Sequence, residues 1–348
     1  MQIPCLDEAE TLPRVVRAIP RQIPGVDVVE VLVVDDGSTD GTVEVARRLG
    51  VDHIVRHVGN KGLAQAFRTG LDACLRLGAD LIVNTDGDDQ YPAADIPRLI
   101  APILEGRAEM VIADRQTSTI QHFSPSKKLL QRLGSWAVRR VSRTEVPDAP
   151  SGFRAYSREA ALRLNVVTTY SYTVETLIQA GVRRTAIAYV PVRVNEQTRG
   201  SRLVRSNATY VKLQLATIVR TYAMYEPLRV FTFLAVPVVA AGLILVGRFL
   251  YLFLSGETGH VQSLVLGAAL LIVGLQVLLN GLLADLIAAN RRLVEEVLYR
   301  LRRAEADAAV QLPKENEMES LDAGYPGDPP DAAAPLPVPA GGPHRRGL

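Results

Sequence analysis

The stretch L-I-V-N-T-D-G-D-D-Q-Y-P, residues 81–92, joins an apolar run to a polar segment that contains three Asp, an Asn and a Gln. The apolar run is typical of a buried strand, so the carboxylates are expected at its end. A solvated turn would tolerate them, whereas a divalent metal site would require them. Asp86, Asp88 and Gln90 alternate, and alternating positions of an extended segment face one side. Oxygen ligands at that spacing suit Mg²⁺ or Mn²⁺, which also take ligands from phosphates.

Short apolar runs alternate with amphipathic stretches from residue 1 to about residue 200. This alternation predicts an α/β domain with a mostly parallel sheet, which binds ligands beyond the carboxyl ends of its strands. At the N-terminus, Met1-Gln2-Ile3 leads straight into Pro4, so the first strand of the sheet is expected to be barely present. The expected strands are Val28–Val34, Asp52–Val55, Leu81–Asn84, Met110–Ala113 and Ala186–Val190, and the expected helices are Thr11–Ile19, Thr42–Leu49, Leu63–Leu77 and Asp95–Leu104.

The composition excludes several classes of protein. A net charge of +2 over 348 residues is nearly balanced, so no nucleic-acid partner is expected. Cys5 and Cys74 provide no disulfide framework, and there is no Cys/His spacing typical of a metal site. The N-terminus has no basic region followed by an apolar stretch, so we expect no signal peptide.

Two long apolar runs, Leu228–Leu254 and Val261–Leu283, lie within residues 228–290. Each can cross a hydrocarbon core, which needs roughly 20 residues. Their connector has no Lys or Arg, whereas basic residues flank the pair. The positive-inside rule therefore predicts a two-helix hairpin in the cell membrane with both termini and the N-terminal α/β domain in the cytoplasm. A pair of buried core helices is the alternative.

The segments on either side of these runs have different compositions. Residues 201–227 are basic and partly amphipathic, so we expect a juxtamembrane segment at the lipid interface. From about Ala304 the chain becomes polar and then rich in Pro, Gly and Ala. This composition predicts a disordered tail over residues 304–348.

Two further motifs follow predicted strands or open predicted helices. V-V-D-D-G-S-T-D-G-T, residues 33–42, puts Asp35 and Asp36 at a strand tip, where a carboxylate can bond a ribose hydroxyl or a base N–H. The alternative is a plain strand-to-helix connection with Asp40 as the helix cap. N-K-G, residues 60–62, opens a helix whose N-terminus favours anions. Lys61 is equally consistent with a solvated side chain.

Basic residues form a further candidate set. Arg115 follows the predicted strand Met110–Ala113, while Lys128 and Arg132 are four residues apart and share a helix face. Such faces are usually solvated. Two more candidate motifs are S-G-F-R-A-Y, residues 151–156, and T-R-G-S-R-L, residues 198–203, of which the second could close over a diphosphate or contact lipid headgroups.

Taken in order, these motifs resemble those of family 2 glycosyltransferases. The order is P-x-x-[N/D]-E, V-V-D-D-G-S-T-D-G-T, N-K-G, D-x-D-x-Q-Y-P, a strand ending in Asp-Arg, S-G-F-R and a late basic loop, over about residues 1–230. The chain looks most like the polyprenyl-phosphate branch, which includes dolichol-phosphate mannose synthases and bacterial polyisoprenyl-phosphate glycosyltransferases. The resemblance implies a GT-A-type, Rossmann-like catalytic domain over residues 1–200.

The resemblance also implies roles for individual residues. Asp7 stands where the family usually has Asn, which affects contacts near the base or ribose. The residues implied to bind the nucleotide are Pro4, Glu8, Asp35, Asp36, Lys61 and Asp86. The metal on the diphosphate would be held by Asp86, Asp88 and Gln90. The acceptor phosphate would be contacted by Arg115, Lys128 and Arg132, and the loop that closes over the site would carry Arg199 and Arg202.

The activity implied is an inverting, metal-dependent transfer from a UDP- or GDP-linked sugar to undecaprenyl or dolichyl phosphate. Such an acceptor is largely dianionic at neutral pH and needs no strong base. Glu175 could act as one, although a structural role is favoured. The alternatives are another lipid or a polysaccharide as acceptor, or a non-catalytic membrane scaffold that binds nucleotide. Membrane lipid is an expected partner, and a homo-oligomer is left open.

Overall fold

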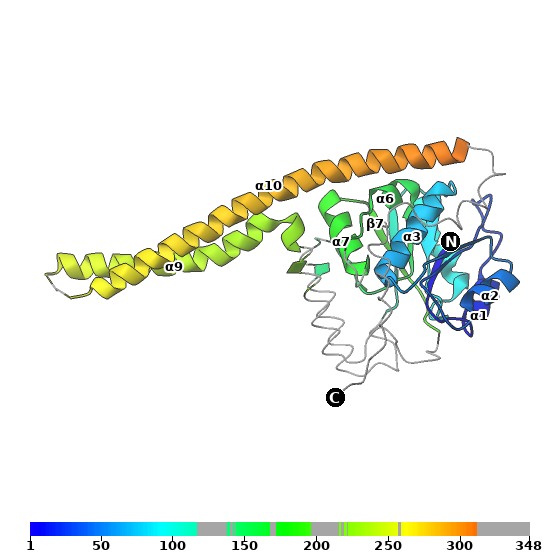
Figure 1. The fold of residues 1–348 in the computed structure, drawn as a ribbon, viewed down its shortest axis with the longest axis horizontal. Helices are drawn as coiled ribbons and strands as arrows, with labels where there is room; N and C mark the ends of the chain where they lie inside the picture. Colours follow the sequence, from blue (N-terminus) through cyan, green and yellow to red (C-terminus); the bar gives the residue numbers. More distant parts are fainter. Residues whose placement is uncertain are drawn as a thin grey trace, which may run out of the picture. The chain divides into compact units, whose positions relative to one another are not determined.

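The computed structural model describes residues 1–116, 138–139, 142, 144–167, 172–195, 216, 219–220, 222–256 and 259–311. In this part of the chain seven strands form one sheet in the order β3-β2-β1-β4-β6-β5-β7 (Figure 1). The strands are β1 Gln2–Cys5, β2 Leu32–Asp35, β3 His53–Arg56, β4 Leu81–Asn84, β5 Met110–Asp114, β6 Arg154–Ser157 and β7 Ile187–Pro191. The prediction of a mostly parallel sheet is confirmed.

One strand, β6, runs antiparallel to both of its neighbours, β4 and β5. The sequence analysis did not predict it, because R-A-Y-S contains a buried Arg in place of an apolar run. Its direction matters for the site. Arg154, at the start of β6, pairs with Asn84, at the end of β4. The S-G-F-R motif therefore arrives at the same edge of the sheet as the acidic segment that follows β4.

The first strand is fully formed, which corrects the expectation that it would be barely present. Gln2–Cys5 pairs residue by residue with Leu32–Asp35 of β2. The carbonyl of Gln2 accepts from Thr85, whereas that of Cys5 accepts from Asp36. Backbone groups alternate along a strand, so Pro4 faces β4, with which β1 pairs only at Gln2. Its missing N–H therefore removes no hydrogen bond to β2.

Helices cover both faces of the sheet, and two consecutive residues of β2 pack into the cores on opposite faces. Val33 packs in one core cluster with Leu12 and Leu99, whereas Val34 packs in the other with Phe67 and Leu177. This arrangement buries both faces, as expected for an α/β sheet. The helices of this part are α1 Leu12–Ala18, α2 Thr42–Arg48, α3 Leu63–Arg76, η1 Ala93–Asp95, α4 Ile96–Leu104, α6 Arg158–Arg163 and α7 Tyr172–Arg183.

Two long helices follow, α9 Pro227–Leu254 and α10 Val261–Gln311, and they run side by side (Figure 1). Both are long and apolar enough to cross a membrane, and only 11% of each most apolar stretch is buried. Core helices of a soluble domain would be mostly buried, so the alternative of a buried pair does not fit. Gly267, Gly274 and Gly281 recur every seven residues where α10 approaches α9.

The end of α10 corrects the predicted tail. Residues 304–311 belong to the helix, although the tail was expected to start at about Ala304. Ala306 is buried, and Asp307 accepts a hydrogen bond of 3.0 Å from Arg158. Strong helix formers and this contact with the catalytic domain together extend the helix. The rest of the predicted tail, and most of residues 201–227, lie outside the described residues; residues 222–225 are helical.

Candidate active site

The parallel strands β1, β2 and β4 point toward one edge of the sheet, and four of the predicted acidic residues, Asp35, Asp36, Asp86 and Asp88, lie at or beyond the carboxyl ends of β2 and β4. Cys5 pairs with Asp35 across the ends of β1 and β2. Asp86 and Asp88 follow β4, which is the other neighbour of β1. A doubly wound sheet binds its ligands at such an edge. The topology therefore brings Asp35, Asp86 and Asp88 toward the same edge of the sheet.

Asp35 is fully buried, and one of its carboxylate oxygens has no hydrogen-bond partner within the described residues. Its Oδ1 accepts from the Ser38 backbone N–H at 3.2 Å. Arg56 Nε lies 3.2 Å from Asp35 Oδ2 and forms an ion pair with it, but the two atoms do not form a hydrogen bond. The Arg56 side chain is 56% exposed. Burying an unsatisfied carboxylate oxygen is costly. This oxygen is suited to accept from a ligand at the strand tip.

Asp36 is fully engaged inside the protein, unlike Asp35. Its carboxylate accepts from His57 Nδ1 at 2.7 Å and from the backbone N–H groups of Lys61 and Gly62 at 2.9 and 2.8 Å. Burial alone would raise the pKa of Asp36, but these hydrogen bonds outweigh it and lower that pKa below its ordinary value. Asp36 thus orders the N-K-G turn. No sequence motif pointed to His57, whose other ring nitrogen lies 3.0 Å from Thr69 Oγ1.

The segment that carries Asp86 and Asp88 is a turn, which corrects the argument that alternation in an extended chain aligns them. Asp89 has a left-handed backbone with φ of 60°, and Asp88 Oδ1 accepts from the Gln90 N–H at 3.1 Å. The charges of the two side chains nevertheless act on each other. Burial, and then the charge of Asp88, raise the pKa of Asp86 to about 7. The turn itself is held from outside, because the Gln90 carbonyl accepts from the Asn195 N–H at 3.0 Å.

Gly152 of the S-G-F-R motif packs closely against the Asp86 carboxylate. A Cβ atom at this position would lie 3.0 Å from Asp86 Oδ2 and 3.0 Å from the Tyr172 hydroxyl. The Gly152 carbonyl accepts from Asn84 Nδ2 at 2.9 Å, and the same amide group lies 2.9 Å from the Tyr172 hydroxyl. Gln2 Nε2 donates to Asn84 Oδ1 at 2.9 Å. This buried network fixes the backbone against which the Asp86 carboxylate lies.

Arg115 is held by a partner that the sequence analysis did not identify. Its Nε and Nη2 donate to the two carboxylate oxygens of Asp148 at 2.6 and 2.9 Å, and both side chains are buried. The positive charge of Arg115 acts on Asp86, since it opposes the rise in the pKa of that residue. The contact between Arg115 and an acceptor phosphate stays a prediction. Arg115 is pre-oriented by a bidentate pair beside the acidic turn.

The loop after β1 closes the opposite side of the acidic turn. Glu8 is buried, and the Thr11 hydroxyl lies 2.7 Å both from Glu8 Oε2 and from the Gly87 carbonyl, so its proton can go to either. Asp7 has φ of 53°, a left-handed conformation that Asn and Asp tolerate best. Asp40 accepts from the Thr42 N–H at 3.1 Å, but the N-cap of α2 is Gly41, so Asp40 lies one residue before the position predicted for it.

Two other candidates have structural partners. The Glu175 carboxylate is buried and accepts from the Val167 N–H at 3.1 Å, which supports the structural role over a catalytic base. Arg154 is also buried; its guanidinium donates to the backbone carbonyls of Ser151, Thr173 and Ala149. It therefore shapes the loop that carries Gly152. The predicted acceptor residues Lys128 and Arg132 and the loop residues Arg199 and Arg202 lie outside the described residues.

The acidic turn fits a divalent metal that takes part of its ligands from a substrate. In the described part of the chain, no group of three or more His, Cys, Asp or Glu side chains could hold a metal by itself. Asp86 and Asp88 supply two carboxylates whose charges repel each other, as the raised pKa of Asp86 indicates. Mg²⁺ and Mn²⁺ commonly bind one or two carboxylates together with substrate phosphates. The donor set is therefore suited to a metal–diphosphate pair.

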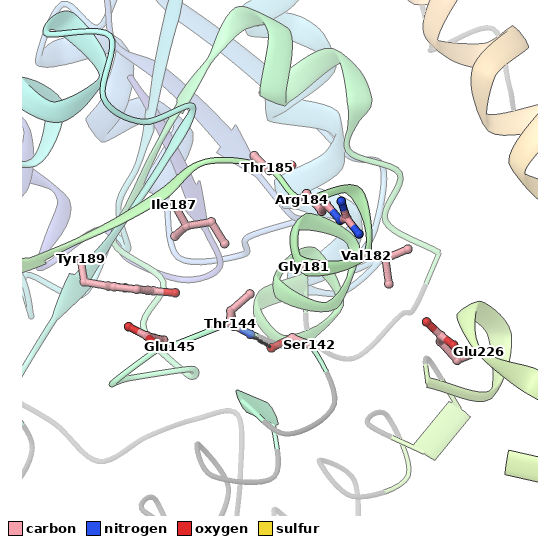
Figure 2. A pocket seen from close by; sticks show the side chains of 10 residues that line it. All are labelled: Ser142, Thr144, Glu145, Gly181, Val182, Arg184, Thr185, Ile187, Tyr189 and Glu226. Atoms are coloured by element: carbon pink, nitrogen blue, oxygen red, sulfur yellow. Dashed lines mark hydrogen bonds between the residues drawn. The ribbon is translucent and has the colours of Figure 1, made fainter. Parts of the chain in front are cut away.

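A separate cavity of about 560 Å³ lies away from this edge (Figure 2). It is lined by the end of α7, the start of β7 and Glu226, with Glu145, Arg184 and Tyr189 as polar lining residues. None of the predicted site residues in the described chain lines it. We therefore assign the site to the strand tips and not to this cavity.

Comparison with known proteins identifies the family. A model of glycosyl transferase family 2 matches residues 2–164. An uncharacterized glycosyltransferase of Mycobacterium tuberculosis is 32% identical over 200 residues, which cover 57% of this chain and 85% of the relative. The chain belongs to glycosyl transferase family 2. The glycosyltransferase assignment and the fold class inferred from the motifs are thereby confirmed.

Other relatives of this family 2 glycosyltransferase have names that specify a polyprenyl-phosphate activity. A polyprenol monophosphomannose synthase of Mycolicibacterium smegmatis is 26% identical, over 62% of this chain and 84% of that protein. An undecaprenyl-phosphate mannosyltransferase of Micrococcus luteus is 27% identical, over 57% and 84%. Glucosyl-3-phosphoglycerate synthase of Mycobacterium tuberculosis, solved with Mn²⁺, UDP-glucose and phosphoglyceric acid, superposes with a TM-score of 0.51 at 25% identity, over 64% of this chain and 78% of that one.

Proposed function

We propose that this glycosyltransferase moves a sugar from a nucleotide-sugar to a polyprenyl phosphate at the cytoplasmic face of a membrane. The observation that carries the proposal is the gathering of Asp35, Asp86 and Asp88 at one sheet edge, in a chain that also has two helices able to cross a membrane. The two relatives named above as polyprenyl-phosphate mannosyltransferases support this acceptor.

On this proposal Asp35 recognises the nucleoside. Its buried Oδ2, which has no hydrogen-bond partner within the described chain, would accept from a base N–H or a ribose hydroxyl. Pro4, Glu8 and Lys61 complete the predicted nucleotide contacts, while Asp36 contributes by ordering the backbone of the N-K-G turn. The N-terminus of α3, which favours anions, would then face the diphosphate.

Asp86 and Asp88, with Gln90, would hold Mg²⁺ or Mn²⁺. When bound, this metal would neutralise the charge that develops on the leaving nucleoside diphosphate. The structural relative solved with Mn²⁺ and UDP-glucose supports a divalent ion. Gly152 and the Asn84 network would keep the Asp86 carboxylate in one position, so that the site is organised before the substrate arrives.

The acceptor phosphate would attack without a strong general base. A phosphomonoester with a second pKa near 6 is largely dianionic at neutral pH. Its oxygen would form a bond to the anomeric carbon while the bond from that carbon to the diphosphate oxygen breaks, and in-line displacement would invert the configuration. Glu175 is engaged by the backbone and is not needed. Arg115, Lys128 and Arg132 would orient the acceptor phosphate, and Arg199 and Arg202 would close over the diphosphate.

The test is transfer by the purified full chain with Mn²⁺, a polyprenyl phosphate and a panel of UDP- and GDP-sugars. We expect one donor to give a glycolipid by mass spectrometry, and no product from Asp88→Ala. Retained nucleotide binding without glycolipid from any donor would favour another acceptor. Glycolipid formation that does not change in Asp88→Ala would overturn the metal assignment.

A further inference from the structure

The C-terminal part of α10 is docked on the catalytic domain along one side. Glu295, Tyr299, Arg302 and Ala306 are separated by four, three and four residues, which places them on one face of a helix. Glu295 and Ala306 are buried. Leu301, on another face of the same segment, is 54% exposed. We call Glu295–Asp307 the docked segment.

The near end of the docked segment is anchored at Glu295. Its Oε2 accepts from Arg183 Nη2 at 2.8 Å, and Arg183 is the last residue of α7. Its Oε1 accepts from Arg291 Nε at 2.8 Å and from the Tyr225 hydroxyl at 3.1 Å. Tyr225 is itself a member of the core cluster that contains α3, α6 and α7. A buried carboxylate with three donors is a specific contact and not a solvated surface pair.

The far part of the segment is held by α6 and α3. The Tyr299 hydroxyl donates to Glu159 Oε1 at 2.9 Å, and the Arg163 guanidinium lies 4.4 Å from the centre of the Tyr299 ring. Arg302 donates to the Leu164 carbonyl at 2.7 Å. Ala306 belongs to the same core cluster as α3. Contacts therefore continue along three turns of the helix.

The helix links these contacts directly to the apolar part. α10 is one helix from Val261 to Gln311, and it contains no proline. From Glu295 to Asp307 the docked segment spans about 18 Å at 1.5 Å per residue. Contacts separated by that distance fix the direction of the helix axis as well as its position. Figure 1 shows α10 passing alongside α6 and α3 after leaving its pairing with α9.

We infer that the docked segment is a rigid strut that sets the orientation of the catalytic domain relative to the membrane, and so presents the site to a lipid-bound acceptor. The inference rests on the proposed function. Tyr299, Glu295 and Ala306 are positioning residues in this account, since they contact neither substrate nor metal. A misplacement of about 1 Å can cost roughly a hundredfold in rate, so a domain free to tilt would use a bilayer acceptor poorly. A short, water-soluble acceptor would not depend on that tilt.

The experiment compares two acceptors in the same vesicles containing the full chain. One is a long polyprenyl phosphate in the bilayer and the other a short, water-soluble prenyl phosphate. Tyr299→Ala combined with Ala306→Phe releases the docked segment. We expect the rate with the bilayer acceptor to fall about tenfold and the rate with the soluble acceptor to stay within about twofold. Tyr299→Phe keeps the ring next to the Arg163 guanidinium, so its rate with the bilayer acceptor should fall much less.

A matched control lies on the same helix. Glu296 and Arg300 form an exposed pair of 3.0 Å, four residues apart. Glu296→Ala with Arg300→Ala should leave both rates unchanged. Equal losses with the two acceptors in the undocked variant would show that the segment only stabilises the fold, and equal rates in all variants would exclude any role. Failure of the unmodified chain with both acceptors would instead count against the proposed function.

A distance measurement tests the strut independently of turnover. Spin labels at Glu44→Cys on α2 and Ile287→Cys on α10 report on the angle between the domain and the helix, and both positions are exposed. The native Cys5 and Cys74 are buried, which protects them from labelling. We expect one narrow distance distribution that broadens in the undocked variant. A distribution that stays narrow after undocking would overturn the inference.

Discussion

Gly152 and Asp86 are in direct contact: a methyl group at position 152 would lie 3.0 and 3.1 Å from the two Asp86 carboxylate oxygens. Contacts that short force one group to move, and the same methyl would meet the Tyr172 hydroxyl at 3.0 Å. Because Asn84 and Tyr172 are buried and hydrogen-bonded to each other, the Asp86 carboxylate is the group that gives way. The glycine of S-G-F-R thus determines where a proposed metal ligand can lie.

Gly152→Ala should therefore weaken Mn²⁺ binding by about 10–100-fold, the range typical of changes behind a ligand. Titration of the purified chain with Mn²⁺ in the presence of nucleoside diphosphate measures this. Thermal unfolding of the same sample checks that the fold survives. Unchanged Mn²⁺ affinity in a folded variant would contradict the placement of Asp86.

Asp36→Asn should lower stability by about 1.5–3 kcal/mol at pH 7, because Asp36 accepts a charge-assisted hydrogen bond from buried His57. The pKa of Asp36 is lowered in the folded protein, so its stabilisation is complete above the ordinary value of about 3.9 and is lost as the pH falls through the folded value. The unfolding midpoints of the unmodified chain and of Asp36→Asn, measured from pH 7 to pH 3, should approach each other only at the lowest pH values. Parallel curves over that range would count against this linkage.

Asp148→Ala should destabilise the fold by about 3–5 kcal/mol, because it leaves the buried Arg115 without its bidentate partner. Arg115→Met combined with Asp148→Leu should recover most of that loss while transfer remains impaired. Denaturant unfolding and a transfer assay on the same three variants separate the two effects. Full activity in the double variant would show that Arg115 serves only the fold.

Gly274→Leu should destabilise the helix pair by about 1–3 kcal/mol, as overpacking usually does. A Cβ at Gly274 would lie 2.5 Å from Val239 Cγ2 of α9, whereas one at Gly247 would meet nothing within 4 Å. Gly247→Leu is therefore the matched control. The midpoint of SDS-induced unfolding in mixed micelles reports on both. A similar shift in the two variants would be inconsistent with the packing of α9 on α10.

The sequence predicted the frame of the protein well, because local patterns determine it. The strand Leu81–Asn84 was predicted at its observed bounds, and α2, α3 and α4 each start within one residue of the expected position. Apolar runs and glycine breaks act within about ten residues, so they can be read along the chain. The apolar length of α9 was equally clear, since it needs no tertiary information.

The partners inside the site could not be predicted, because they come from distant parts of the chain. His57 reaches Asp36 from 21 positions away and Asp148 reaches Arg115 from 33, with no local signal for either. The antiparallel β6 lacks an apolar pattern because it begins with Arg154, whose buried guanidinium donates to the carbonyls of Ser151 and of Thr173 in α7. The helical end of α10 was missed for the same reason, since its contacts with α6 lie more than 100 residues away in sequence.

The most direct test of the central claim is the stoichiometry of transfer in vesicles that contain the full chain, Mn²⁺, polyprenyl phosphate and the active nucleotide-sugar. The account predicts one glycolipid formed per nucleoside diphosphate released, and neither product when Asp88 is replaced by Ala. Release of nucleoside diphosphate without glycolipid, or glycolipid formed equally well by Asp88→Ala, would contradict it.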